Sequence, residues 1–189
     1  MNSSLSKFKN YHGDWYTYKE TYENVNIEVK EPAYTLNFGL NLDHSCRCMV
    51  YFRSEDYKEQ CFGDKRIGPK DCDLTVLEDK SVYQFEIKDT RAKKKNFNSA
   101  NEQINMNDNL LKSILWFIDP QDMCGLKNFN SEHIIIHIRQ RDSLERGIDL
   151  QKENNYTIVK LRMDRKQKSG KYNLRKQRKR TTRGRERKS

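Results

Sequence analysis

Long apolar runs are absent from this sequence. Its 189 residues contain no stretch of about 18 consecutive apolar residues, the length that a membrane-spanning helix needs. Residues 1–10 also lack the apolar segment of a secretory signal. We therefore expect no membrane association and a reducing compartment, in which the five cysteines are free thiols. These are Cys46, Cys48, Cys61, Cys72 and Cys124.

Glycine and proline are scarce, with 8 and 3 residues, and the glycines are not clustered. A loop that cradles phosphate is therefore not predicted. The sequence also has no nucleophile elbow, no Rossmann fingerprint and no His-Glu-x-x-His helix. Because the acidic residues are scattered through predicted loops, we expect a protein without enzymatic activity and without a cofactor.

The cysteines and histidines are poorly spaced for a zinc site. Structural zinc sites usually place two cysteines on a turn with two residues between them, whereas Cys46 and Cys48 alternate on a predicted strand. His133 and His137 share a strand face about 13 Å apart, too far to chelate one ion by themselves. No metal site is predicted.

The positive charge is concentrated at the C-terminal end. The whole chain has a net charge of +10, but residues 162–189 hold 14 Lys and Arg against 2 Asp and Glu, so the remaining residues carry a net charge of −2. Only Tyr172 and Leu174 are apolar between residues 165 and 189, too few to offset the entropy of ordering. We predict a folded body and a disordered basic tail.

The tail predicts nuclear import and contact with nucleic acid. Its densest part has the spacing of a nuclear localisation signal, which an import receptor reads through acidic grooves. The same residues release counterions from a phosphate backbone, so they are also predicted to bind nucleic acid without sequence preference. A merely solvated end is the alternative. The residues are Arg175, Lys176, Arg178, Lys179 and Arg180.

Alternating apolar residues predict five strands in the body. The strands cover residues 34–42, 46–53, 82–88, 132–139 and 156–163, and a further alternating run lies at residues 25–29. The first two are expected to form a hairpin. Residues 54–73 and 140–155 are predicted as polar loops, and Ser99-Ala-Asn-Glu102 as a capping box that starts a helix ending at Ile118.

The order is three strands, one helix and two strands (β-β-β-α-β-β), which predicts a mainly β domain with a small Greek-key barrel. The segments Leu74–Tyr83 and Leu150–Tyr156 look like polar turns that deliver a tyrosine into a barrel strand. In this order and in these segments the chain resembles an OB fold. We therefore divide it into an aromatic N-terminal arm (1–24), an OB-like barrel (25–164) and the basic tail (165–189).

The arm and the barrel supply the candidate binding residues. Tyr11, Trp15, Tyr18 and Tyr22 would share one stripe if the arm were helical, and this stripe is expected to pack on the barrel or on a protein partner. A groove for single strands needs aromatic platforms and positive charge. The candidates for it are Arg47, Tyr51, Arg53, Lys93, Lys94 and Lys95.

The negative body favours a protein partner in the groove and nucleic acid on the tail. The chain resembles small accessory subunits of single-strand-binding and telomere-capping complexes, of the replication-protein-A or terminin kind. That resemblance implies a non-enzymatic nuclear adaptor in chromosome-end protection or DNA maintenance. Arg183-Gly-Arg185 leaves an RNA-binding or ribosome-biogenesis factor, in the nucleolus, as the alternative. A viral or cytosolic regulator that uses the tail only for import is a third class.

Deletion of residues 165–189 should abolish nuclear accumulation and most nonspecific binding to nucleic acid, because the tail holds the excess positive charge. The body should stay folded. Binding of the full and the shortened chain to a labelled single-stranded oligonucleotide at increasing salt measures this. Unchanged binding after the deletion would contradict it.

Overall fold

The structure is a computed structural model that describes residues 3–11, 13–20, 24–31, 34–41, 48–68, 71–78, 81–89, 94–118, 130–141, 148–153, 156–164 and 169–173. The elements in chain order are α1 (Ser3–Phe8), β1 (Tyr16–Lys19), β2 (Asn24–Glu31), β3 (Tyr34–Asn41), β4 (Met49–Phe52), α2 (Ser54–Phe62), β5 (Leu74–Glu78), β6 (Ser81–Asp89), α3 (Lys94–Ile118), β7 (Asn130–Arg141), β8 (Ile148–Glu153), β9 (Tyr156–Asp164) and β10 (Ser169–Asn173).

Seven strands form a mixed sheet in the order β1-β4-β5-β6-β7-β9-β8. Strands β1, β4, β5 and β6 pair antiparallel, as do β8 and β9, whereas β6–β7 and β7–β9 are parallel. Parallel neighbours need a long crossover, and α3 supplies it between β6 and β7. Strands β2, β3 and β10 form a second sheet, in which β10 and β3 are parallel.

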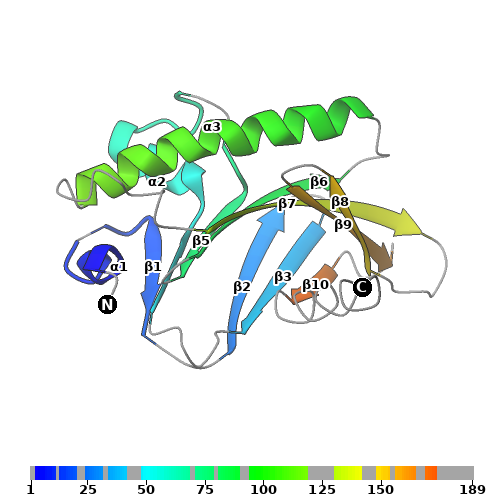
Figure 1. The fold of residues 1–189 in the computed structure, drawn as a ribbon, viewed down its shortest axis with the longest axis horizontal. Coiled ribbons are helices and arrows are strands. Elements are labelled where there is room, and N and C mark those ends of the chain that lie inside the picture. Colours follow the sequence, from blue (N-terminus) through cyan, green and yellow to red (C-terminus); the bar gives the residue numbers. More distant parts are fainter. Residues whose placement is uncertain are drawn as a thin grey trace, which may run out of the picture.

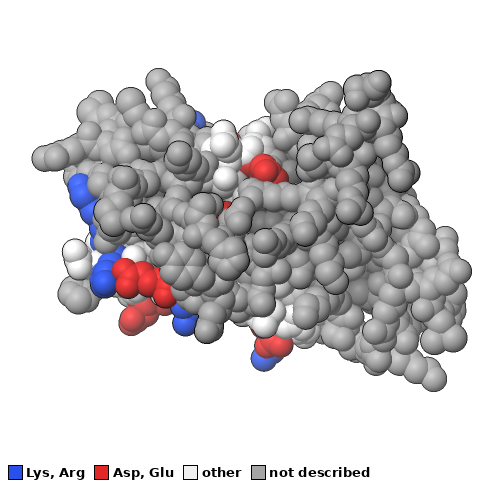
Figure 2. All heavy atoms as spheres, turned by 60° about the horizontal axis from the view of Figure 1, so that its bottom comes forward, with Lys and Arg blue, Asp and Glu red and all other residues white. Residues whose placement is uncertain are grey.

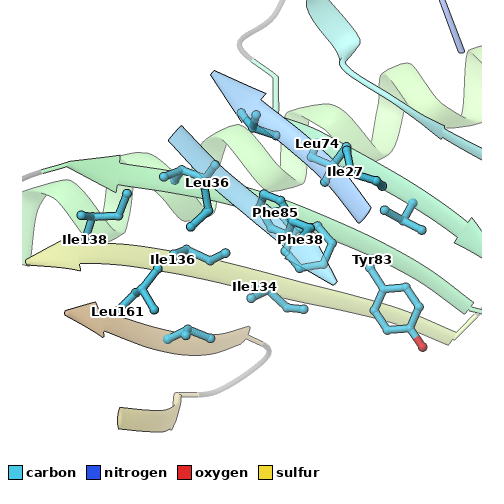
Figure 3. Close-up of a cluster of buried hydrophobic side chains, with 14 of the residues drawn as sticks. Ile27, Leu36, Phe38, Leu74, Tyr83, Phe85, Ile134, Ile136, Ile138 and Leu161 are labelled. Atoms are coloured by element: carbon cyan, nitrogen blue, oxygen red, sulfur yellow. The ribbon is translucent and has the colours of Figure 1, made fainter. Parts of the chain in front are cut away.

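The two sheets enclose the larger core. The inward residues of β2 and β3 pack on one face of the large sheet, and Phe38 meets Phe85 edge-on with ring centroids 5.0 Å apart (Figure 3). The buried members are Val25, Ile27, Val29, Leu36, Phe38, Met49, Leu74, Val76, Tyr83, Phe85, Ile87, Ile134, Ile136, Ile138, Val159 and Leu161.

The helices cover the opposite face of the large sheet (Figure 1). Near β1 and β4, α1 and the C-terminal half of α3 bury a second cluster, and the N-terminal half of α3 packs on Cys72 and Ile135. The large sheet is thus the middle of three layers. The second cluster contains Leu5, Phe8, Trp15, Cys48, Val50, Phe52, Tyr57, Leu77, Val82, Leu111, Ile114 and Leu115.

The mainly β composition and the long helix before the last large-sheet strands agree with the sequence analysis, but the Greek-key barrel does not. The edge strands β1 and β8 lie at opposite ends of the large sheet, and no pairing between them closes it among the described residues. The expected hairpin of residues 34–42 and 46–53 is also wrong. Strand β3 pairs with β2 and β10, whereas β4 pairs with β1 and β5 in the other sheet.

Three segment predictions need correction. Residues 54–73 are not all loop, because they contain α2, which ends at Gly63 with a left-handed φ of 72° that glycine adopts without strain. The long helix begins at Lys94, so Ser99 is inside it rather than at its cap. The predicted loop 140–155 contains β8.

The arm and the tail both contribute strands. Strand β1 of the arm extends the large sheet, and β10, inside the segment expected to be disordered, pairs with residues 35–39 of β3. Deleting residues 165–189 therefore removes a strand as well as charge. A chain that ends after Asn173 keeps β10 and tests the remaining tail alone.

In the view of Figure 2, several of the described acidic and basic side chains lie next to one another. Two exposed ion pairs of the described surface are Lys30 with Glu28 at 2.8 Å and Lys9 with Glu20 at 3.1 Å. Within the described ranges, no helix combines the length and the apolar character needed to cross a membrane.

Replacing Phe38 with alanine should lower the free energy of unfolding by about 3–5 kcal/mol, because the fully buried ring joins the two sheets. The matched control is Phe62→Ala on α2, where 56% of the residue is exposed, with an expected loss under about 1 kcal/mol. Urea denaturation of both variants measures the difference. Equal losses would contradict the packing of the small sheet on the large one.

Candidate functional site

Polar side chains gather where the N-terminal half of α3 and helix α2 cover the large sheet. Strand β6 directs Tyr83, Phe85 and Ile87 into the core between the sheets, so its alternate residues face the helices. Among these alternate residues, Gln84 and Glu86 are fully buried, with 0% and 2% exposure. Burying charged and polar groups costs free energy unless they are partnered, so their partners define the site.

Two aspartates reach the site from the segment before β5. Asp73 accepts a hydrogen bond from the Ile87 backbone N–H at 2.6 Å, next to Glu86. Asp71 forms an ion pair with Lys58 of α2, whose Nζ lies 3.1 Å from Oδ2. The start of β5 and the end of β6 are adjacent in the antiparallel ladder, which brings the carboxylates of both segments together.

Lys88 and Gln103 complete the arrangement. The Lys88 ammonium pairs with Oε1 of Glu86 and donates to Oε1 of Gln103 on α3 at 2.7 Å. Gln103 in turn donates from Nε2 to the backbone carbonyl of Asp71 at 3.4 Å. We call Asp71, Asp73, Glu86, Lys58 and Lys88 the carboxylate–lysine cluster. Glu86 and Lys58 lie buried beneath a rim of half-buried residues.

Glu86 is the electrostatically strained member of this cluster. Burial, followed by the nearby charge of Asp73, raises the pKa of its carboxyl to about 8, although Lys88 opposes the shift. Its second oxygen, Oε2, is buried and has no hydrogen-bond partner among the described residues. A cation beside Oε2 would favour the ionised form and offset the repulsion from Asp73.

The donor set suits a hard divalent cation. Mg²⁺ prefers oxygen ligands and is usually held by one or two carboxylates together with waters and substrate phosphates. Asp73 and Glu86 bring two carboxylates side by side, and the Ile87 backbone N–H donates to that of Asp73. Among the described residues, no three His, Cys, Asp or Glu side chains form a ready metal cage. The cluster can therefore supply two ligands rather than a full coordination shell.

A buried hydrogen-bond network beside the cluster fixes the helices on the sheet. Asn107 of α3 donates to Thr75 and to Gln84, both at 3.1 Å, and its Oδ1 accepts from Ser54 at the start of α2 at 2.6 Å. These bonds join α2, α3, β5 and β6. They hold Lys58 and Gln103, which lie on the two helices, in register with Glu86 on the strand.

Asp108 extends the network to β7. Although burial opposes the shift, the neighbouring His133 imidazole and a hydrogen bond from Gln84 hold the pKa of the Asp108 carboxyl below its usual range. His133 Nε2 lies 3.5 Å from Asp108 Oδ2 and faces the helices rather than solvent. His133 is thus half-buried between β7 and α3.

Of the predicted groove residues, the structure describes the side chains of Tyr51 and Arg53. Tyr51 packs against the core between the sheets, and Arg53 forms an ion pair with Glu55 at 3.2 Å. The expected outward face of β4 is covered because β4 lies in the middle layer. Lys94 and Lys95 begin α3, and their side chains are not among those described. Arg47, Lys93 and the tail residues Arg175, Lys176, Arg178, Lys179 and Arg180 lie outside the described residues.

The predicted aromatic stripe is not a helix face. Trp15 is buried, with its ring centroid 5.0 Å from that of Phe52 and 4.8 Å from that of Tyr57. Tyr18 lies on strand β1, and Tyr11 is exposed in the turn after α1. Tyr22 lies outside the described residues. The stripe was expected to pack on the barrel or on a protein partner, and Trp15 packs on the chain's own core.

Apolar alternation along residues 82–88 predicts the strand but not the cluster, because the polar face of an alternating strand usually lies in solvent. The available signal was the pair Glu86 and Lys88, opposite charges two residues apart on a strand that also carries Val82, Tyr83, Phe85 and Ile87. Such charges are uncommon within strands. Two aspartates, Asp71 and Asp73, stand at the start of the preceding strand, and together these features mark one end of a hairpin.

No protein-family model matches this chain, and neither a curated protein nor a solved structure does.

Replacing Glu86 with glutamine should change how stability depends on pH when divalent cations are absent. The folded carboxyl keeps its proton to a pKa of about 8, whereas the unfolded one loses it near 4.5, so wild-type stability falls as pH rises between these values. The variant lacks this loss and should gain about 1–3 kcal/mol over wild type across the range.

Urea denaturation in EDTA at both ends of the range measures the gain. Glu102→Gln, on the exposed side of α3, is the matched control and should follow wild type. Parallel profiles for wild type and Glu86→Gln would contradict a buried, strained carboxyl.

Proposed function

We propose that this chain is a divalent-cation-dependent phosphodiesterase that acts on nucleic acid. The observation that carries the proposal is Glu86, a carboxylate that is 2% exposed, lies beside Asp73, and has one oxygen without a partner in the described structure. A metal ion held by two such carboxylates polarises a phosphoryl oxygen and lowers the pKa of a bound water.

The chain's own residues divide the remaining work. Asp73 and Glu86 hold the cation, and the hydrogen bond from the Ile87 N–H orients Asp73. Lys88 is fixed by Glu86 and Gln103 at the half-buried rim, where its ammonium stabilises negative charge on the phosphate. In the hydrolysis, the water oxygen bonds to phosphorus and the bond to one ester oxygen breaks. One proton of the water passes to that leaving oxygen, and the other stays on the phosphomonoester product.

Nucleic acid is the favoured substrate because of the tail. Residues 162–189 carry a net charge of +12 and, by counterion release, bind a polyanionic backbone far better than a small phosphate ester. The cluster itself contains three carboxylates and repels an anionic substrate unless cations offset them. Attraction by the tail and chemistry at the cluster are therefore separate functions of the chain.

The non-enzymatic nuclear adaptor remains a second candidate, favoured by an exposed aromatic pair at the end of α3. Trp116 and Phe117 are 51% and 62% exposed, with ring centroids 5.3 Å apart. Exposed aromatics are enriched at protein interfaces. In this reading the pair contacts a partner subunit, the tail contacts nucleic acid or an import receptor, and the cluster is structural.

Cleavage of labelled single-stranded DNA, duplex DNA and RNA by the full chain separates the two candidates. We expect cleavage with Mg²⁺ or Mn²⁺ and none in EDTA. Glu86→Gln and Lys88→Met should lose about 100-fold or more in rate, because the first removes a ligand of the cation and the second removes the ammonium that stabilises charge on the phosphate. The tail should remain able to bind in both variants.

The matched control is Glu102→Gln, an exposed glutamate on α3, which should cleave like wild type. Two results would contradict the proposed phosphodiesterase activity and favour the adaptor: a wild-type chain that cleaves none of the three substrates with either ion, or a Glu86→Gln variant as active as the control.

A further inference from the structure

Strand β2 is an edge strand of the small sheet. The order of that sheet is β10-β3-β2, so β2 pairs with β3 on one side and with no described strand on the other (Figure 1). An edge strand directs the backbone N–H and C=O of every second residue away from its partner. Water can bind these groups, but only another β-strand pairs with all of them in one register.

Edge strands are usually protected against such pairing, and β2 has little protection. Common devices are a short strand, a bulge, a proline or an exposed lysine. Strand β2 has eight residues, contains no proline and pairs with β3 in continuous register. Its inward residues Val25, Ile27 and Val29 are apolar and buried. Lys30 is an exposed lysine, but Glu28 offsets its charge at 2.8 Å.

The exposed face of β2 is complementary in charge to a second copy of itself. Glu28 and Lys30 flank Val29 on this face, with 45% and 74% of their side chains exposed. If two β2 strands pair antiparallel about a two-fold axis at Val29, each Glu28 lies directly opposite the Lys30 of the other copy. Opposite charges at such positions stabilise a strand pair, and a two-fold interface makes each contact twice.

We propose that the free edge of β2 docks the β2 strand of a second copy of this chain, with Val29 at the two-fold axis. The two small sheets then join into one sheet in the order β10-β3-β2-β2-β3-β10. A strand pair is small compared with the about 1,200–2,000 Å² that stable interfaces bury, so the dimer forms as concentration rises. The inference does not use the cation site, which lies on the large sheet.

This dimer carries two basic tails at opposite edges of the joined sheet. The dense basic segment of residues 175–180 follows β10 in the chain. Because neighbouring strands lie about 4.8 Å apart, the two β10 strands are about 24 Å from each other. One nucleic-acid strand can then contact both tails, which raises the apparent affinity without any new kind of contact.

Sedimentation velocity of the full chain at increasing concentration tests the pairing. Wild type should shift from monomer to dimer. Glu28→Lys and Lys30→Glu each place like charges opposite one another twice, so each should weaken the dimer about tenfold or more. The double variant with both changes exchanges the two charges and should dimerise within about threefold of wild type.

Lys9→Glu is the matched control, since it reverses one charge of an exposed ion pair outside β2 and should dimerise like wild type. Amide hydrogen exchange of the wild-type chain locates the interface without any variant. Residues 24–31 should exchange more slowly as the concentration rises, because pairing protects the backbone N–H groups at the free edge.

Three results would overturn the inference. A chain that stays monomeric from low-micromolar to submillimolar concentration would leave the edge to a strand of a different protein. Protection outside β2, for example at Trp116 and Phe117, would place the interface elsewhere. A dimer that neither single reversal weakens, or that the double exchange does not restore, would contradict the register. None of these results bears on cleavage, so the proposed phosphodiesterase is tested separately.

Discussion

The burial of Glu86 is the constraint on which the rest of the site depends. A carboxylate taken out of water requires partners, and the fold supplies Lys88 on one oxygen and none among the described residues on the other. Asp73 adds a like charge beside it, held in place by the Ile87 backbone. In the proposed function, the cation would bind beside this unpartnered oxygen and offset the repulsion between the two carboxylates.

The three-layer architecture places this strained group where helices can reach it. The small sheet closes one face of the large sheet, so the opposite face must be covered by α2 and α3. Asn107 ties both helices to the strands through hydrogen bonds to Ser54, Thr75 and Gln84. The same helices carry Lys58 and Gln103, so the packing that covers the sheet also assembles the cluster.

Period-two alternation in the sequence identified most strands, because apolar residues on one strand face report burial directly. It could not assign β3 and β4 to different sheets, because alternation shows which residues are buried but not which strands pair with each other. Both faces of β4 are also buried, so its alternation does not single out one sheet. Helix α2 could not be predicted from apolar periodicity, because two of the three residues on its buried face, Ser54 and Lys58, are not apolar. The cluster was missed for the same reason: burial of Glu86 contradicts the rule that charges face water.

The most direct test of this account is a carboxyl-carbon NMR titration of Glu86 in the full chain, with and without Mg²⁺. The account predicts that Glu86 titrates with a pKa near 8 in EDTA and that Mg²⁺ keeps it ionised well below that pH. A Glu86 signal that titrates near 4.5 in EDTA, or one that Mg²⁺ does not move, would contradict it.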